Sequence, residues 1–118
     1  MVTVLVDAQN VRRSLWPNLS PEELVARCGD WATAKGIGAL VVFDGPAPHT
    51  PVVEGLEVVG TAAESADDRI ATEAERCAIA GEPYWLVTSD RALRARAGAA
   101  AERTIGGGVF VRELTEAA

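Results

Sequence analysis

Short apolar runs recur along the chain, and most are separated by longer stretches in which apolar residues have helical spacing. None of the runs alternates with polar residues, which is typical of strands buried on both faces of a sheet. The pattern therefore predicts an α/β fold, with a mostly parallel sheet and helices on both of its faces. The five candidate strands are residues 3–6, 39–43, 56–59, 84–87 and 109–111.

Three helices are predicted between these strands. The first has the clearest signals, because Ser20 and Glu23 have the spacing of a capping box and Gly36 supplies a stop. The second spans about residues 66–80, where apolar residues repeat at helical spacing. The third begins near residue 89 or 90 and continues through residue 97.

A run of three glycines occupies positions 106–108. It precedes a candidate strand instead of linking a strand to a helix, and no Lys-Ser or Lys-Thr pair follows it, so it does not match a phosphate-binding loop. We interpret the run as a flexible turn.

Length and composition predict one globular domain covering residues 1–118. Apolar residues make up 48% of the chain and charged residues 24%, which excludes disordered and fibrous classes. No apolar run approaches the ~20 residues that span a bilayer, and Asp7 interrupts the first run before a signal peptide could form. We therefore expect a cytoplasmic protein without a membrane partner, and the sequence leaves the oligomeric state open, a homodimer included. Cys28 and Cys77 fall on apolar helix faces, which predicts reduced core cysteines.

The net charge of −6 is unfavourable for a protein that binds nucleic acid, because phosphates usually attract an excess of Lys and Arg. Arginines nevertheless gather near two candidate strand ends, and such groups can form local basic patches on an acidic protein. The two groups are Arg12 with Arg13, and Arg91 with Arg94 and Arg96.

The aspartates have a positional bias that the glutamates lack. Of the six aspartates, five lie just after a candidate strand or at the start of the helix that follows one. The carboxyl ends of parallel strands meet at one edge of the sheet, and ligands of open α/β sheets bind there. We therefore expect five acidic side chains to converge at this edge. They are Asp7, Asp44, Asp67, Asp68 and Asp90.

Such a convergence requires a positive partner. Two carboxylates about 5 Å apart repel by roughly 3 kcal/mol at an effective dielectric constant near 20. All candidate ligands are oxygens, and no set of His or Cys residues suits zinc. The prediction is therefore a bound hard divalent cation, Mg²⁺ or Mn²⁺.

Each aspartate taken alone also has a purely structural explanation, since Asp after a strand often caps the next helix. Asp68 shows the competition, because Ser65 and Asp68 have capping-box spacing and Asp68 can bond back to the Ser65 backbone. That leaves Asp67 as the better candidate ligand. Capping does not explain why the acids at this edge are Asp while Glu dominates elsewhere.

Other polar residues lie near the same strand ends. Asn10 can contact a ligand water or a phosphate, or it can be a turn residue. Thr88 and Ser89 offer hydroxyls to a substrate beside Asp90, or they cap the helix that follows. His49 is interpreted as a solvated loop residue in preference to a general acid.

The three tryptophans are interpreted as packing residues in preference to platforms on which bases stack. Trp16, beside Pro17 in a loop, is the least committed of them. The other two are Trp31 and Trp85.

Four stretches resemble the NYN domain, specifically its YacP-like branch within the PIN-like nuclease superfamily. They occur in the family's order and cover most of the chain. Ala8 and Gln9 stand where the family commonly has Gly and an aromatic residue, and the chain is shorter than typical YacP-like members. The four stretches are residues 4–11, 41–45, 64–70 and 87–91.

The resemblance implies a PIN-like, doubly wound sheet with strand order 3-2-1-4-5 and a metal-dependent site that cleaves RNA as an endoribonuclease. The positions that match the family's site are Asp7, Asn10, Asp67 and Asp90. Asp44 and Asp68 match more loosely placed acids.

The leading hypothesis is a ribonuclease in which a water activated by Mg²⁺ or Mn²⁺ attacks the RNA backbone in line, so that no side-chain nucleophile is needed. Arginines would hold the flanking RNA backbone. Two alternatives remain: the same site acting on a small nucleotide, and a PIN-like module that binds RNA or a protein without cutting. The arginines proposed for the backbone are Arg12, Arg13, Arg91 and Arg94.

Overall fold

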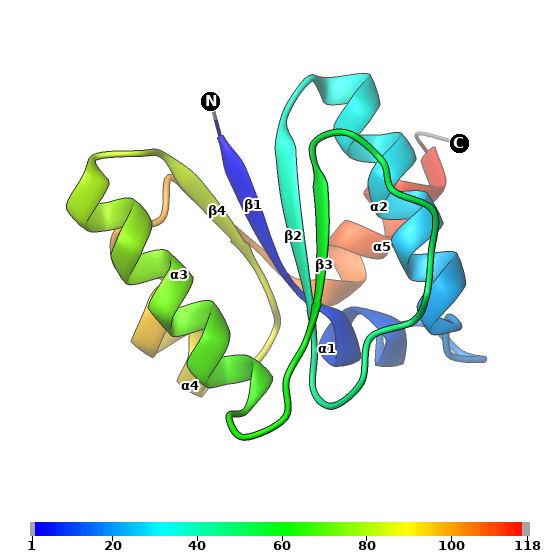
Figure 1. Cartoon of the computed structure of the whole chain (residues 1–118), viewed down its shortest axis with the longest axis horizontal. Helices are drawn as coiled ribbons and strands as arrows, with labels where there is room; N and C mark the ends of the chain where they lie inside the picture. The colour runs from blue at the N-terminus through cyan, green and yellow to red at the C-terminus, as the bar shows by residue number, and fades with distance from the viewer. Residues whose placement is uncertain (1, 117–118) are drawn as a thin grey trace.

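A computed structural model describes residues 2–116 and contains one five-stranded sheet. Its strands are β1 (Thr3–Asp7), β2 (Gly38–Phe43), β3 (Leu56–Gly60), β4 (Tyr84–Val87) and β5 (Arg103–Ile105). Their order is β3-β2-β1-β4-β5, and every pairing is parallel (Figure 1). The α/β class and the strand order implied by the resemblance are therefore confirmed.

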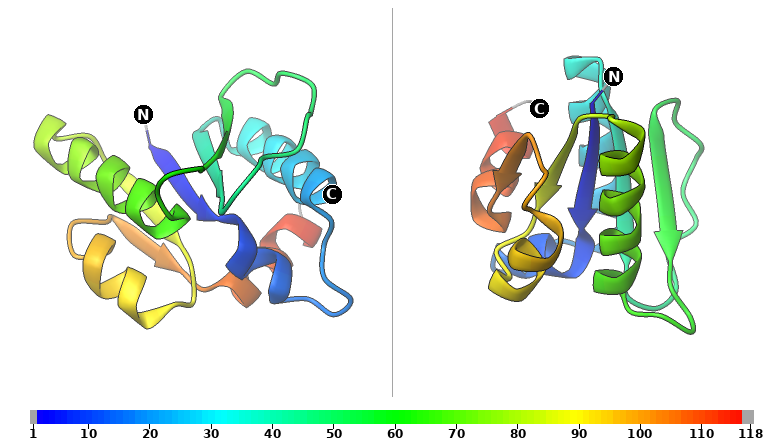
Figure 2. Two further views of the ribbon diagram at one scale, coloured as in Figure 1. Left: turned by 60° about the horizontal axis from the view of Figure 1, so that its bottom comes forward. Right: turned by 90° about the vertical axis from the view of Figure 1, so that its left-hand side faces the viewer.

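The helices are α1 (Ala8–Arg13), α2 (Pro21–Lys35), α3 (Ala66–Ala80), α4 (Arg91–Ala97) and α5 (Gly107–Glu116). One face of the sheet is covered by α1, α2 and α5, and the other by α3 and α4 (Figure 2). Apolar periodicity did not predict α1, because only Ala8 and Val11 of this short helix are buried. Within residues 2–116, no helix has the length and apolar character needed to cross a bilayer.

The central strand β1 shows why its sequence lacks polar alternation. Val4 and Val6 pack into the core under α1, α2 and α5, whereas Leu5 packs into the core under α3 and α4. Successive residues of a strand point to opposite faces, so a strand covered on both sides needs apolar residues at every position. Asp7 ends the strand and is buried as well, although its side chain is polar.

The C-terminal part of the sequence was assigned wrongly. The predicted strand 109–111 lies inside α5, and two of the three predicted turn glycines begin that helix. Phe110, Val111 and Leu114 are buried together, which is the spacing of a helix face. The fifth strand is β5, an edge strand of three residues in which only Ile105 is buried, so it has no apolar run to reveal it.

The cysteines and two of the tryptophans behave as predicted. Cys28 and Cys77 are free and buried, and burial raises the pKa of the Cys28 thiol to about 12. Trp31 packs against Phe110 with ring centroids 4.9 Å apart, and against Trp85 at 6.3 Å. The packing interpretation of Trp16 was wrong, because its side chain is 88% exposed.

Candidate active site

A pocket of about 270 Å³ lies at the carboxyl edge of the sheet. This is where the strand order reverses, since β1 has β2 on one side and β4 on the other. Other hollows of about 290 to 480 Å³ are larger, but none of them gathers a comparable set of carboxylates. The pocket is lined by Asp7, Gln9, Asn10, Arg13, Asp44, Ser65, Ala66, Asp67 and Asp90.

Thr88 connects the aspartate that ends β1 with the one that precedes α4. Its side chain is fully buried. The hydroxyl donates a hydrogen bond to Asp7 Oδ2 at 2.9 Å and accepts one from the backbone N–H of Asp90 at 3.1 Å. We expected Thr88 to contact a substrate, but the structure engages its hydroxyl within the protein, where it positions both aspartates.

Asp90 and Asp44 each use one carboxylate oxygen to accept a backbone hydrogen bond. Asp90 Oδ1 accepts the N–H of Leu93 at 3.0 Å and so caps α4. Asp44 Oδ1 accepts the N–H of Ala66 at 3.4 Å, at the start of α3. Helix capping therefore explains the role of one carboxylate oxygen in each residue. Both residues also line the pocket.

The carboxylates of Asp7 and Asp67 are destabilised in their charged forms. Burial raises the pKa of Asp7 against the opposing effect of the Thr88 hydrogen bond, and the charges of Asp67 and Asp90 raise it further. Burial also raises the pKa of Asp67, and so do the charges of Asp90 and Asp44, against the opposing effect of the positive charge of Arg96 outside the pocket. The pocket therefore concentrates negative charge that its own side chains do not neutralise.

Asp68 does not line the pocket, contrary to the expected convergence of five acids. It is next to Asp67 on α3, but its Oδ1 contacts Nη1 of Arg96 at 2.7 Å. The Arg96 guanidinium lowers the pKa of Asp68. Successive helix residues point about 100° apart, which is why only one of the two neighbours can face the pocket.

The pocket aspartates do not form a ready-made set of three metal ligands. Within the part of the chain that the structure describes, no three His, Cys, Asp or Glu side chains are grouped so as to hold one ion. What the pocket offers is a set of carboxylate and amide oxygens from four segments of the chain. Oxygens of this kind are the donors preferred by hard divalent cations.

A second polar network fixes Asn10 beside the pocket. Asn10 Oδ1 accepts the backbone N–H of Ser89 at 2.9 Å, and Ser89 Oγ accepts the N–H of Gly107 at 2.8 Å. A Cβ atom at Gly107 would meet Asn10 Oδ1 at 2.6 Å and would clash with the hydroxyl of Ser14. The glycine at the start of α5 thus allows this helix to approach α1, a role that the sequence analysis missed.

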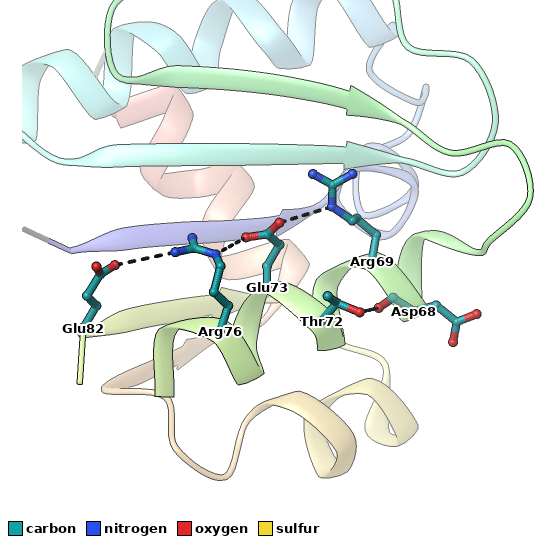
Figure 3. Close-up of polar contacts among 6 residues, drawn as sticks. All are labelled: Asp68, Arg69, Thr72, Glu73, Arg76 and Glu82. Atoms are coloured by element: carbon teal, nitrogen blue, oxygen red, sulfur yellow. Dashed lines mark hydrogen bonds and ion pairs between the residues drawn. The ribbon is translucent and has the colours of Figure 1, made fainter. Parts of the chain in front are cut away.

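Several basic residues away from the pocket are paired with acids. On α3, Glu73 contacts Arg69 at 3.3 Å and Arg76 at 3.0 Å, and Arg76 reaches Glu82 at 4.0 Å (Figure 3). The opposite charges in these pairs therefore neutralise one another.

The arginines expected to bind RNA have no such partners. Within residues 2–116, no carboxylate oxygen lies within 4.0 Å of a guanidinium nitrogen of any of the four. Two of them donate to backbone carbonyls instead: Arg12 Nε to Leu19 at 2.7 Å, and Arg94 Nε to Thr88 at 2.8 Å. Their positive charges are therefore not cancelled by ion pairs, although the chain is acidic as a whole. The four are Arg12, Arg13, Arg91 and Arg94.

This architecture is shared with solved structures. Rae1 (YacP) from Bacillus subtilis matches with a TM-score of 0.78 and 22% sequence identity, over 99% of this chain and 75% of the Rae1 chain. The chain has a YacP-like fold. A tryptophan-to-leucine variant of Rae1 matches with a TM-score of 0.79 and 21% identity, over 99% of this chain and 77% of that one. No family model and no curated protein matches the sequence.

In this YacP-like fold, the four positions that the resemblance assigns to the site all line the one pocket: Asp7, Asn10, Asp67 and Asp90. Gln9, where the resembled family commonly has an aromatic residue, has a structural role that the sequence analysis did not recognise. Its side-chain amide donates to the Asp44 carbonyl and accepts the Asp44 N–H, both at 3.4 Å. Gln9 thus ties the end of β1 to the end of β2.

Proposed function

We propose that the chain is a metal-dependent endoribonuclease whose reaction takes place in the aspartate pocket. The observation that carries this proposal is the convergence of four carboxylates from four segments of the chain on one pocket, flanked by arginines without ion pairs. A structural role alone does not require this arrangement, because repulsion between the carboxylates destabilises the fold. The likeness to Rae1 supports the fold and leaves the activity as our proposal.

The donors fit Mg²⁺ or Mn²⁺. All of them are oxygens, and Mg²⁺ commonly keeps several waters while using only one or two protein carboxylates, so a three-carboxylate centre is not required. One or two of Asp7, Asp67 and Asp90 would contact the ion directly, and the remaining acids, Asp44 included, would contact it through its waters. When bound, a divalent ion lowers the pKa of a water and neutralises charge that develops on a phosphate.

The remaining residues orient the acids and the RNA backbone. Thr88 fixes the side chain of Asp7 and the backbone of Asp90. Asn10, held by Ser89, places its amide beside the pocket without adding charge. Of the four arginines proposed to bind the RNA backbone, Arg13 lines the pocket itself, and we assign it to a phosphate contact.

Replacing Asp7 by Asn tests the proposal. Asn keeps an oxygen that can accept the Thr88 hydrogen bond, so the fold stays intact. Loss of the charge is expected to lower the rate of Mn²⁺-dependent cleavage of a fluorescent oligoribonucleotide by about 100-fold or more. Asp30→Asn is the matched control, because Asp30 is exposed on α2 and does not line the pocket. Undiminished cleavage by Asp7→Asn would falsify the assignment.

The acidic net charge of −6 favours a second candidate, the hydrolysis of a small nucleotide in the same pocket. Such a substrate needs no broad basic surface. Nucleoside triphosphates and oligoribonucleotides assayed side by side with Mn²⁺ separate the two candidates. If calorimetry shows no uptake of divalent ion at millimolar concentration, both enzymatic candidates fail and a binding module is left.

A further inference from the structure

We infer that Trp16 is a platform on which a base of the single-stranded RNA stacks, next to the pocket that receives the RNA backbone. The inference rests on the proposed function and adds a residue that positions the substrate. Trp16 does not pack in the core, since it is 88% exposed.

Trp16 differs from the other two tryptophans in its exposure and in having no aromatic or cationic partner among the described residues. Trp31 packs edge-to-face against Phe110 and at a tilt against Trp85, and Trp85 also lies under the guanidinium of Arg103 at 5.1 Å. No aromatic or cationic side chain within residues 2–116 contacts the ring of Trp16 in this way. A large aromatic side chain is usually kept from water by packing, and an exposed tryptophan offers a large apolar surface with a polar N–H to a ligand.

The base of the loop that carries Trp16 is fixed. Leu19 is buried, its N–H donates to the Arg12 carbonyl at 3.3 Å, and Arg12 Nε donates to the Leu19 carbonyl at 2.7 Å. These two bonds close the segment between α1 and α2. In Figure 1 this segment is the blue loop that projects at the lower right of the molecule. Trp16 therefore lies within a loop whose two ends are anchored to each other.

The loop continues directly from the wall of the pocket. Asn10 and Arg13 of α1 both line the pocket, and Trp16 follows Arg13 by three residues. Three Cα–Cα steps span about 11 Å at most. That distance corresponds to about three nucleotides of a stacked strand, so one RNA segment can reach both the pocket and Trp16.

Stacking also answers the difficulty posed by the acidic chain. Proteins that bind single strands combine cationic side chains along the backbone with aromatic side chains under the bases. Here Arg13 supplies an unpaired cation beside the acids, and Trp16 supplies affinity that does not depend on net charge. A protein with a charge of −6 needs such a contribution more than a basic protein does.

The test measures RNA binding separately from cleavage. In an Asp7→Asn background, which prevents turnover, Trp16→Ala is expected to weaken binding of a single-stranded oligoribonucleotide by about 5- to 100-fold, as expected for one base stacked on an aromatic ring. Trp16→Phe is expected to retain most of the affinity, because it keeps an aromatic face. An oligomer that carries abasic sites throughout is expected to bind both proteins equally, since it has no base to stack. Ile79→Ala is the control for losing an exposed apolar side chain, because Ile79 is 80% exposed on α3.

Equal RNA affinity of Trp16→Ala and the parent overturns the inference, even if the wild-type chain cleaves RNA. An equal loss of affinity for the abasic oligomer overturns it as well. If Trp16→Ala changes only the sedimentation coefficient, the tryptophan is a contact between copies of the chain and the inference is wrong. Trp16-dependent RNA binding without any cleavage by the wild-type chain leaves the inference standing and removes the proposed enzyme.

Discussion

The charged residues in the middle of α3 and those of the carboxyl edge behave in opposite ways. In the middle of α3, Glu73 sits between Arg69 and Arg76, so these three charges have partners (Figure 3). At the edge, Asp67 and Arg13 line one pocket without an ion pair of their own. Acidic and basic side chains therefore stabilise the middle of α3, whereas the unpaired carboxylates destabilise the carboxyl edge. Such a local destabilisation is typical of a ligand-binding site.

Among the variants of the two regions, Asp67→Asn is expected to have the largest effect on RNA cleavage. Removing a pocket carboxylate should lower metal-dependent RNA cleavage by about 100-fold. A rate equal to that of the wild type would show that the pocket charge has no catalytic use.

The same variant also tests the destabilisation of the carboxyl edge. The pKa of Asp67 is raised above 3.8 in the folded chain, so the folded chain binds a proton more tightly than the unfolded one does. The contribution of this group to the free energy of unfolding is therefore greatest at low pH and falls as pH rises through the raised pKa. Asp67→Asn is expected to reduce that fall and to raise the Tm at pH 7 by roughly 1–3 °C in metal-free buffer. Thermal unfolding followed by circular dichroism between pH 4 and 7 measures both.

Thr88→Val is expected to have the next largest effect. It removes the hydroxyl that donates to Asp7 Oδ2 and that accepts the part-buried N–H of Asp90. We expect about a ten-fold fall in kcat and a loss of about 1–3 kcal/mol in the free energy of unfolding. Thr88→Ser keeps the hydroxyl and should restore the rate, whereas a deficit shared by both variants would assign the effect to packing.

Gly107→Ala is expected to disturb the edge more mildly. The new methyl group would press on Asn10 and Ser14, with a cost of about 1–3 kcal/mol in stability and a several-fold slower reaction. The adjacent Gly108→Ala is a matched control, because a Cβ there meets nothing within 4 Å. In a helix this control should be neutral or stabilising by about 0.5–1 kcal/mol. Similar results for both variants would show that the close approach of α5 to α1 at Gly107 does not have the proposed role.

Glu73→Gln is expected to have the smallest effect. It breaks the ion pairs with Arg69 and Arg76, and such pairs near a surface contribute at most about 1 kcal/mol. The cleavage rate should be that of the wild type, because Glu73 does not line the aspartate pocket. A large loss of activity would contradict the separation of the two regions.

The sequence was informative where an element is built from one uninterrupted pattern. The strands β1 to β4 are apolar runs, and the capping residues of α2 and α3 are confirmed by hydrogen bonds from Glu23 to Ser20 and from Asp68 to Ser65, both at 3.1 Å. It failed for β5, whose residues are mostly exposed at the sheet edge, and for α5, whose glycines weaken the helical signal. In both, tertiary contacts decide the structure.

For the site, strand ends were enough to bring Asp7, Asp44, Asp67 and Asp90 to one pocket. They could not show that Asp68 turns toward Arg96, a residue 28 positions further along the chain. The contacts of Thr88 with Asp7 and of Gly107 with Asn10 likewise join distant segments. No local pattern encodes such pairings.

Because the carboxylates of the pocket are crowded, the melting temperature of the chain should depend on whether a cation is bound there. When the chain unfolds, Asp7, Asp67 and Asp90 move apart and any cation bound among them is released, so ligand binding and global unfolding are linked by mass action. A melting curve recorded across a library of ions and cationic compounds would rank their fit to this edge before any substrate is known. The repulsion that weakens the empty fold is what makes that readout sensitive.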